Sequence, residues 1–178
     1  SISSFGNANC NSGCDGFATV LINNGKPPYI YLWDDPLGQS TALADSLCAG
    51  TWTVSIIDSN GCTGSIPQTI TEPPLLDVVI SNQSNITCNG DCDGTATALT
   101  SGGTGTYTYQ WNTAPVQTTS TAGSLCPGTY GLTVLDQNGC LDTTSVTITE
   151  PPILTLTTSV ADANCGQFDG SATVMATG

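Results

Sequence analysis

The 178-residue chain has a formal net charge of −13, Lys26 as its only cation, and no histidine. This composition excludes the cationic contacts on which nucleic-acid binding depends, gives no electrostatic attraction to an anionic membrane, and rules out histidine-based catalysis or metal ligation. Charged residues make up 8% and hydrophobic residues 38% of the chain. The sequence therefore predicts strands around cores, at a length that fits two domains and part of a third.

A long internal repeat dominates the sequence. Residues 10–74 align without a gap with residues 88–152, a shift of 78 residues, and a third copy begins near Cys165. This fidelity at a fixed period indicates an array of like modules. We expect repeat one at 1–74 with a truncated start, repeat two at 75–152, and the truncated beginning of repeat three at 153–178. No signal peptide or transmembrane run is evident. The sequence starts and stops in the middle of the repeat pattern, so we expect a segment of a longer mature protein.

Short β-branched or apolar runs, separated by turns about every ten residues, predict the strands of each repeat. In repeat two the expected strands are 75–80, 95–100, 107–111, 117–125, 129–135 and 143–149. Pro67 falls in the last strand of repeat one, which predicts that this strand lies at a sheet edge. The predicted fold class is all-β, with tandem immunoglobulin-like antiparallel β-sandwiches.

Aromatic residues alternate along one predicted strand of each repeat. Tyr29, Tyr31 and Trp33 share one face of their strand, and this face is either core or a sugar-stacking platform; we favour core. No catalytic constellation accompanies it, because the serines and threonines have no histidine partner and the only lysine is solitary. The sequence therefore predicts a protein that is not an enzyme.

Nine cysteines at repeating positions predict a disulfide framework and an oxidising, extracellular setting. The alternative, a zinc site beginning at Cys10 and Cys14, fits poorly, because Cys48 and Cys62 flank a predicted strand. Disulfide-stapled sandwiches are therefore the expected architecture.

The order of the motifs resembles a known family. Repeat two contains a cysteine followed by Asp-Gly-x-Ala-Thr, then Gly-x-x-x-Tyr-x-Tyr-x-Trp, Leu-x-x-Gly-Thr-Tyr, Asp-x-Asn-Gly-Cys and Ile-Thr-Glu-Pro-Pro. This series is similar to the SprB-type repeat, an immunoglobulin/PKD-like module of large bacterial surface adhesins and filaments. The resemblance implies a cell-surface location, export by type IX secretion and, in some members, gliding motility. This sequence departs from the commonest pattern by carrying four cysteines per full repeat rather than two.

The cysteine pairing is only partly determined by these patterns. An immunoglobulin-like topology places Cys14 near Cys48, and likewise Cys92 near Cys126, at one end of each sandwich. Each bridge would close a loop of about 35 residues, worth roughly 4 kcal/mol in the chain-entropy model. For the others, the simplest scheme keeps the pairs within each repeat, although it joins opposite ends of the sandwich. The alternative is that they pair between repeats. The ninth cysteine has no partner left in this sequence, which is compatible with either scheme. The within-repeat pairs are Cys10–Cys62 and Cys88–Cys140, and the remaining cysteine is Cys165.

Aspartates at the expected strand ends have two interpretations. They are weak calcium candidates, because calcium takes clustered carboxylates, or they cap turns through bonds to their own backbone. We favour caps and expect no cofactor or metal. The residues concerned are Asp15, Asp58, Asp93 and Asp136.

Taken together, these patterns predict a structural repeat segment of an extracellular adhesin or filament. It would act as a stiff, disulfide-reinforced stalk that contacts neighbouring repeats of its own chain and self-associates into fibres, without nucleic acid and without membrane insertion. The alternative function is a carbohydrate- or cell-surface-binding adhesion module.

Overall fold

The computed structural model describes residues 1–178 as fourteen strands, with no helix long and apolar enough to cross a membrane. The strands of repeat one are β1 (Ile2–Gly6), β2 (Gly16–Val20), β3 (Ile30–Trp33), β4 (Leu43–Leu47), β5 (Gly50–Ile57) and β6 (Thr63–Ile70). Those of repeat two are β7 (Asp77–Ser84), β8 (Gly94–Ser101), β9 (Thr108–Trp111), β10 (Thr121–Leu125), β11 (Gly128–Leu135) and β12 (Leu141–Ile148). Two more follow, β13 (Thr155–Ala161) and β14 (Ser171–Thr177).

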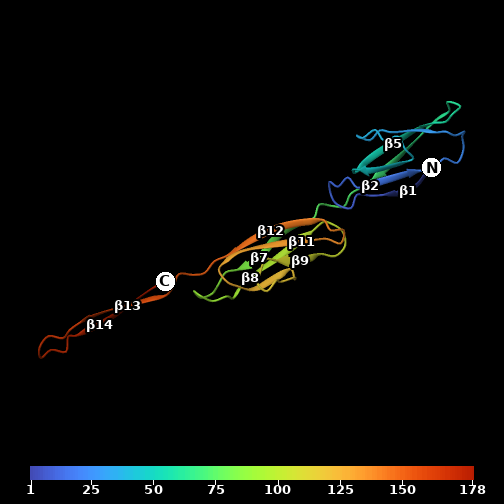
Figure 1. The fold of residues 1–178 in the computed structure, drawn as a ribbon. Helices are drawn as coiled ribbons and strands as arrows, with labels where there is room; N and C mark the ends of the chain where they lie inside the picture. Colours follow the sequence, from blue (N-terminus) through green and yellow to red (C-terminus); the bar gives the residue numbers. More distant parts are fainter. The chain divides into compact units, whose positions relative to one another are not determined.

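Each of the first two repeats forms two three-stranded sheets (Figure 1). The strand orders are β1-β2-β4 and β3-β5-β6 in repeat one, and β10-β8-β7 and β12-β11-β9 in repeat two. The strands pair antiparallel. The chain is therefore all-β, and the second pair of sheets has the same strand order as the first.

One core lies between the two sheets of repeat one. Its seven buried side chains come from strands of both sheets, which makes the repeat a sandwich: Ala18, Val20, Trp33, Ala44, Leu47, Val54 and Ile70. The seven positions 78 residues further on are buried as well: Ala96, Ala98, Trp111, Ala122, Leu125, Leu132 and Ile148. The periodic apolar positions of the sequence are thus the core positions of the fold.

Tryptophan fills the centre of each core. Trp33 is 1% and Trp111 0% exposed, and each indole N–H donates to a backbone carbonyl, at 3.0 Å to Thr41 and 2.9 Å to Thr119. Satisfying that N–H removes the penalty of burying an indole. These tryptophans belong to the core, as the period-two pattern predicts.

In each repeat, an aromatic side chain at the start of the long hairpin donates a hydrogen bond back to the turn that precedes it. The Tyr130 hydroxyl donates to the Cys126 carbonyl at 3.0 Å, and the Trp52 indole does the same to Cys48 at 2.9 Å. A tyrosine that bonds a backbone carbonyl a few residues upstream is a feature of immunoglobulin-like sandwiches. Together with the sheet topology, it supports the immunoglobulin-like assignment.

The expected strand boundaries hold to within two residues, with the exceptions of β7, which ends at Ser84 rather than at Ile80, and of β10. Pro67 lies in β6, an edge strand, as predicted. In contrast, β7 begins at Asp77 rather than at Leu75, because the preceding residues belong to the linker, whose Pro74 carbonyl accepts a bond from Gly103.

The second exception is β10, which begins at Thr121 rather than at Gln117. The Gln117 side chain exchanges two bonds with the Gly123 backbone, at 3.0 and 2.9 Å, and its carbonyl accepts the Trp111 N–H at 3.0 Å. Residue 117 therefore closes a loop rather than extending a strand.

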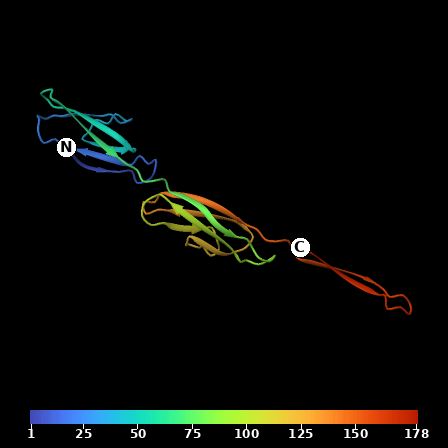
Figure 2. The same cartoon turned by 180° about the vertical axis from the view of Figure 1, so that it is seen from behind.

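The Cα positions divide the chain into two compact units whose limits differ from the sequence repeats. The first unit contains Ser1–Val78, Thr100–Thr108 and Val134–Asp142, and the second contains Val79–Leu99, Tyr109–Thr133 and Thr143–Gly178. Repeat boundaries at 74/75 and 152/153 stay predictions from the sequence. The β13–β14 pair, red in Figure 2, is a two-stranded antiparallel hairpin.

Candidate functional site

Two disulfides occupy equivalent places in the two repeats. Cys14 is joined to Cys48 and Cys92 to Cys126, each across a sequence separation of 34 residues. These are the pairs that the expected sandwich topology places at one end. Each bridge ties the loop before the second strand of its repeat to the turn that enters the long hairpin.

The third disulfide differs from the simplest expected scheme. Cys10 is joined to Cys140, across a separation of 130 residues, whereas Cys62, Cys88 and Cys165 are unpaired and exposed. The expected pairs Cys10–Cys62 and Cys88–Cys140 are therefore absent, and the bridge runs between repeat one and repeat two.

The length of β5 explains why the within-repeat pair does not form. The Cys14–Cys48 bridge holds the Cys10 loop near the start of β5, while Cys62 lies in the hairpin that follows β5. An eight-residue strand spans about 26 Å, but the Cα atoms of a disulfide must lie within about 7 Å of each other. Cys10 therefore cannot reach the hairpin of its own repeat.

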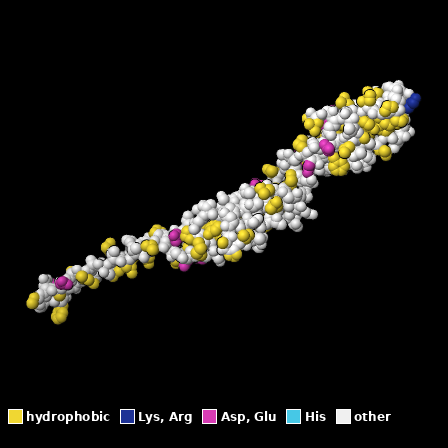
Figure 3. All heavy atoms as spheres, viewed as in Figure 1, with side chains coloured by type: hydrophobic (Ala, Val, Ile, Leu, Met, Phe, Trp, Pro, Cys, Tyr) yellow, Lys and Arg dark blue, Asp and Glu magenta, His cyan; other side chains and the backbone are white.

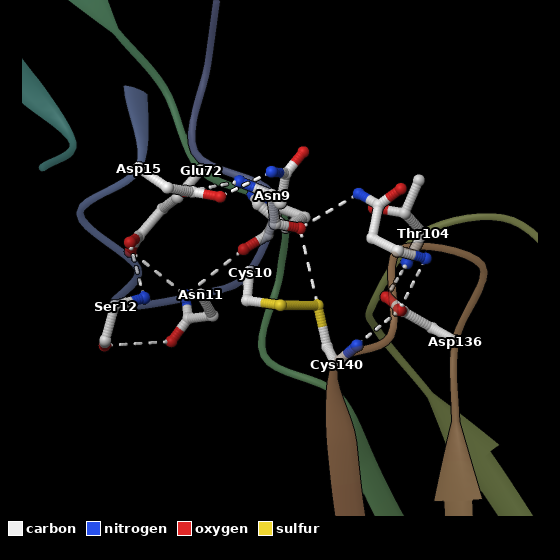
Figure 4. Close-up of a disulfide and its surroundings, with 11 residues drawn as sticks. Asn9, Cys10, Asn11, Ser12, Asp15, Glu72, Thr104, Asp136 and Cys140 are labelled. Atoms are coloured by element: carbon white, nitrogen blue, oxygen red, sulfur yellow. Dashed lines mark hydrogen bonds between the residues drawn. A yellow bond between two sulfur atoms is a disulfide. The ribbon is translucent and has the colours of Figure 1, made fainter. Parts of the chain in front are cut away.

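A glutamate holds the loop that carries Cys10 (Figure 4). The Glu72 carboxylate accepts the Ser12 backbone N–H at 2.6 Å and the Asn11 side-chain N–H at 3.0 Å. The Asn11 side chain also donates to the Pro73 carbonyl at 3.2 Å. The loop is thus fixed to the residues that lead into the linker, and Cys10 projects from it toward Cys140.

An aspartate holds the hairpin that carries Cys140. Asp136 is 5% exposed, and its Oδ1 accepts the backbone N–H groups of Asn138 and Cys140, both at 2.9 Å. Its Oδ2 accepts the Thr104 N–H at 2.8 Å. One carboxylate therefore orders both the hairpin turn and a neighbouring turn (Figure 4).

The disulfide is accompanied by a hydrogen bond between the two loops. The Asn138 side chain donates to the Asn9 carbonyl at 2.9 Å, one residue before Cys10 and two before Cys140 on the respective sides. The bridge and this bond connect the same two loops, and both cysteines belong to the first compact unit. We call this arrangement, built from the loop 9–14 and the hairpin 136–140, the joint.

The linker also packs at the joint. The Gly103 N–H donates to the Pro74 carbonyl at 2.9 Å, and Leu76 is 5% exposed. Gly103 has φ +63°, and a Cβ there would lie 2.8 Å from Asp136 Oδ2, so only glycine fits. The turn capped by Asp136 is therefore also the surface on which the linker rests.

The four aspartates proposed from the sequence act as turn caps. Asp58 accepts N–H bonds from Asn60 and Cys62, and the remaining two bond the residue that precedes each cysteine loop: Asp15 with Asn9, and Asp93 with Thr87. No cluster of three or more His, Cys, Asp or Glu side chains is placed to hold a metal ion. At each of the four aspartates, at least one backbone N–H group donates to the carboxylate.

These bonds favour the ionised carboxylates. At Asp136, burial by itself would raise the pKa, but the N–H bonds from Thr104 and Cys140 outweigh burial and the pKa lies below its usual range. Hydrogen bonds to the carboxylate likewise lower the pKa values of Asp15, Asp58, Asp93 and Asp169. Ionised carboxylates therefore help hold the turns at the joint.

Acid is expected to destabilise the fold. A carboxylate whose pKa is lower in the folded than in the unfolded chain stabilises the fold above its unfolded pKa of about 3.9, and this contribution is lost as the pH falls through the folded value. The free energy of unfolding should stay level from pH 7 to about pH 5 and fall below about pH 4. Thermal unfolding followed by circular dichroism between pH 7 and pH 2 measures it.

Two matched variants distinguish the effect of a capping aspartate on stability from the effect of removing any one negative charge. Asp136→Asn should lower the melting temperature at pH 7 and make the fall with acid shallower, whereas Asp162→Asn, an exposed residue outside the joint, should leave both unchanged. A stability that rises on acidification would contradict the capping role.

Sequence reasoning missed Glu72 and Asn138. Glu72 belongs to the Glu-Pro-Pro triplet that ends repeat one, and its carboxylate binds the cysteine loop. The available signal was the recurrence of Asn11 and Glu72 as Asn89 and Glu150. A polar pair retained at the repeat spacing indicates a contact, although it does not indicate which one.

The structure thus defines a class: disulfide-bridged, immunoglobulin-like β-sandwiches. A family model of the SprB repeat matches residues 80–116. The resemblance to the SprB repeat inferred from the motifs is therefore confirmed over this stretch. The matched stretch includes the Cys88 loop and the strand that ends in Trp111.

Two solved structures are similar to the chain at low sequence identity. No curated protein matches the chain. A solved structure of the C-terminal 282-residue fragment of intimin, in complex with the intimin-binding domain of the translocated intimin receptor, is similar with a TM-score of 0.46 and 17% identity. The similarity covers 88% of this chain and 66% of the fragment. The amphioxus IgVJ-C2 molecule has a TM-score of 0.36 and 14% identity over 78% of this chain and 97% of its own.

Proposed function

We propose that the chain is a structural repeat segment of an extracellular bacterial surface adhesin or filament, where it forms a stiff, disulfide-reinforced stalk. The observation that carries this proposal is the Cys10–Cys140 bridge, which ties a loop of one repeat to a hairpin of the next. The SprB repeat at residues 80–116 supports the same assignment.

A covalent joint suits a protein that bears load. Backbone hydrogen bonds between strands each contribute only about 1 kcal/mol net to stability, and they separate one after another under tension. A disulfide does not yield when these bonds shear. The Pro73-Pro74 pair adds to stiffness, because proline fixes its own φ and restricts the residue before it.

The surface suits contact between like chains. White, which marks the backbone and uncharged polar side chains, covers most of the face seen in Figure 3, with few carboxylates among it. Lys26 is the only cation in the chain. Association would therefore depend on polar and apolar contacts rather than on ion pairs, and we propose that neighbouring stalks associate side by side into fibres.

The remaining attributes follow from the family and the bridges. Structural disulfides persist in oxidising compartments, which supports a location outside the cell. The similarity to the SprB repeat, a family resembling adhesin modules, supports a role without catalysis. Type IX export, adhesion and a part in gliding motility are proposed from the family alone.

The carbohydrate-binding alternative has less support. Its strongest candidate was the aromatic strand of each repeat, but Trp33 and Trp111 are buried. Their rings pack in the core and offer no face to a sugar.

Immunogold labelling of intact cells tests the proposed function. Antibodies raised against this chain are expected to label the outside of unbroken cells, on fibres where the surface carries them, with regular spacing along each fibre. Labelling that requires broken cells would refute the surface location. Strong binding of the chain to a glycan array, without fibres on the cells, would favour the adhesion module.

A further inference from the structure

We propose that Cys62 and Cys88 form disulfides with adjacent copies of this repeat in the same polypeptide, so that the joint recurs at each repeat boundary. Cys62, on a hairpin, would pair with a loop cysteine equivalent to Cys10. Cys88, on a loop, would pair with a hairpin cysteine equivalent to Cys140. The inference rests on the proposed function and names the partner of that same site.

The Cys62 hairpin has the same construction as the Cys140 hairpin. Asp58 Oδ1 accepts the Asn60 and Cys62 N–H groups at 2.9 Å, and the Asp58 N–H donates to the Cys62 carbonyl at 3.0 Å. The corresponding three bonds at Cys140 have the same lengths. The Asn-Gly-Cys sequence is also the same. The backbone therefore presents Cys62 as it presents Cys140.

The Cys88 loop likewise matches the Cys10 loop. Glu150 accepts the Gly90 N–H at 2.9 Å, and the Asn89 side chain donates to the Pro151 carbonyl at 3.0 Å. A backbone bond to the Cys88 carbonyl, at 3.1 Å, corresponds to one of 3.0 Å at Cys10. Cys62 and Cys88 are thus each one half of a joint whose complete form is present between Cys10 and Cys140.

A cavity beside Cys62 corresponds to the place in repeat two where the linker packs against the turn at Gly103. It has a volume of about 540 Å³ and is lined in part by Asn24, Gly25, Asp58 and Cys62. At the equivalent place in repeat two, Leu76 approaches within 3.1 Å of the Cβ position of the glycine equivalent to Gly25. A linker with two apolar residues after Pro-Pro is the occupant that this cavity fits.

The place where the linker packs indicates which repeat supplies the partner of Cys62. In the observed joint, the linker that fills the turn is continuous with the first strand of the repeat that it enters. A preceding repeat on the same polypeptide supplies both the linker and the loop cysteine together. One difference is Asn24, which stands where repeat two has Gly102 and does not share its positive φ. The linker therefore passes this residue by a different path.

Formation of each bridge is a two-step exchange with a small-molecule disulfide such as oxidised glutathione. The Cys62 thiolate attacks one sulfur of that disulfide and releases one small thiolate, leaving a mixed disulfide. The partner's loop thiolate then attacks the Cys62 sulfur and releases the second. The protein thiols are oxidised, the small disulfide is reduced to two thiols, and these take up the two protons.

The test uses the native protein, alkylated before isolation and digested without reduction. Mass spectrometry is expected to find Cys62 and Cys88 protected from alkylation, each in a peptide linked to a peptide of another repeat copy. Cys62 should be linked to a loop cysteine and Cys88 to a hairpin cysteine. On a denaturing gel, reduction should leave the size class of the intact protein unchanged, because the links lie within one polypeptide.

Several results would overturn the inference: alkylated Cys62 or Cys88, a Cys62–Cys88 link, or multimers that dissociate on reduction. With surface labelling intact, such a result defeats the inference and leaves the proposed function standing, whereas a lack of surface labelling defeats the proposed function. A second readout comes from Cys62→Ser in the native protein. It should expose one newly alkylatable loop cysteine in the adjoining repeat, while Cys165→Ser should not produce a free hairpin thiol in repeats one or two.

Discussion

Replacing Cys10 and Cys140 by serine is expected to lengthen the chain under tension by about 210 Å. The bridge spans 130 residues, and the two internal disulfides within that span each enclose 34. Subtracting the two internal loops leaves 62 residues that only the Cys10–Cys140 bridge protects. At about 3.3–3.6 Å per extended residue, their release gives the added length.

Single-molecule force spectroscopy with handles at the two termini measures this length. The comparison is best made with Cys62, Cys88 and Cys165 replaced by serine in every protein, because these free thiols would otherwise exchange with the bridges. Strands β1 and β12 lie outside the bridged span and should extend in all variants alike. The difference between the bridged and the unbridged protein then reports the joint alone.

A matched variant tests whether the Cys10–Cys140 disulfide is the bond that resists extension under force. Cys14→Ser with Cys48→Ser removes an internal disulfide but keeps Cys10–Cys140, so it should add no length even when repeat one unfolds. An unbridged protein that extends no further than the bridged one would mean that the force does not pass through the Cys10–Cys140 bond. The load-bearing role would then fail.

The sequence predicted the sandwich well because its signals are local. Turn dipeptides, period-two alternation and the position of Pro67 each depend on a few neighbouring residues, and these placed the strands and the edge. The Cys14–Cys48 pair followed from the topology, since both residues lie at one end of the sandwich. Alternating aromatics also placed Trp33 and Trp111 in the core.

The joint was harder to predict because, in a repeated sequence, a cysteine such as Cys10 has equivalent candidate partners in both repeats. Cys62 and Cys140 occupy equivalent positions in nearly the same local sequence, so alignment alone gives no reason for Cys10 to prefer one of them. The choice depends on a distance, the length of β5, which keeps Cys10 away from the hairpin of its own repeat. The within-repeat pairs join opposite ends of the sandwich, and the sequence does not show the path of the linker that brings Cys140 near Cys10.

Replacing Trp111 by alanine is expected to destabilise repeat two by about 3–5 kcal/mol. Trp111 is fully buried, and its removal loses apolar burial, leaves a cavity, and removes the donor of the bond to the Thr119 carbonyl. For a domain of this size, each kcal/mol lowers the melting temperature by about 4–8 °C. Repeat two should therefore melt well below the wild-type protein, or fail to fold at ordinary temperature.

The intrinsic fluorescence of the chain allows the two repeats to be followed separately. The Trp111→Ala protein retains only Trp33 and Trp52, both in repeat one, so its tryptophan emission reports that repeat while circular dichroism reports both. Urea unfolding should then show an early transition by circular dichroism that the fluorescence lacks. Coincident transitions at the lower urea concentration would instead mean that the joint couples the two repeats into one cooperative unit.

Two controls separate the ring from its hydrogen bond. Trp111→Phe keeps an aromatic ring in the core but leaves the Thr119 carbonyl unpaired, so its loss of stability should be smaller than that of alanine and at least about 1 kcal/mol. Leu99→Ala changes a side chain that is 60% exposed and should stay within about 0.5 kcal/mol of wild type. A Trp111→Ala protein as stable as Leu99→Ala would show that the core does not depend on this ring, and the sandwich assignment for repeat two would lose its main energetic support.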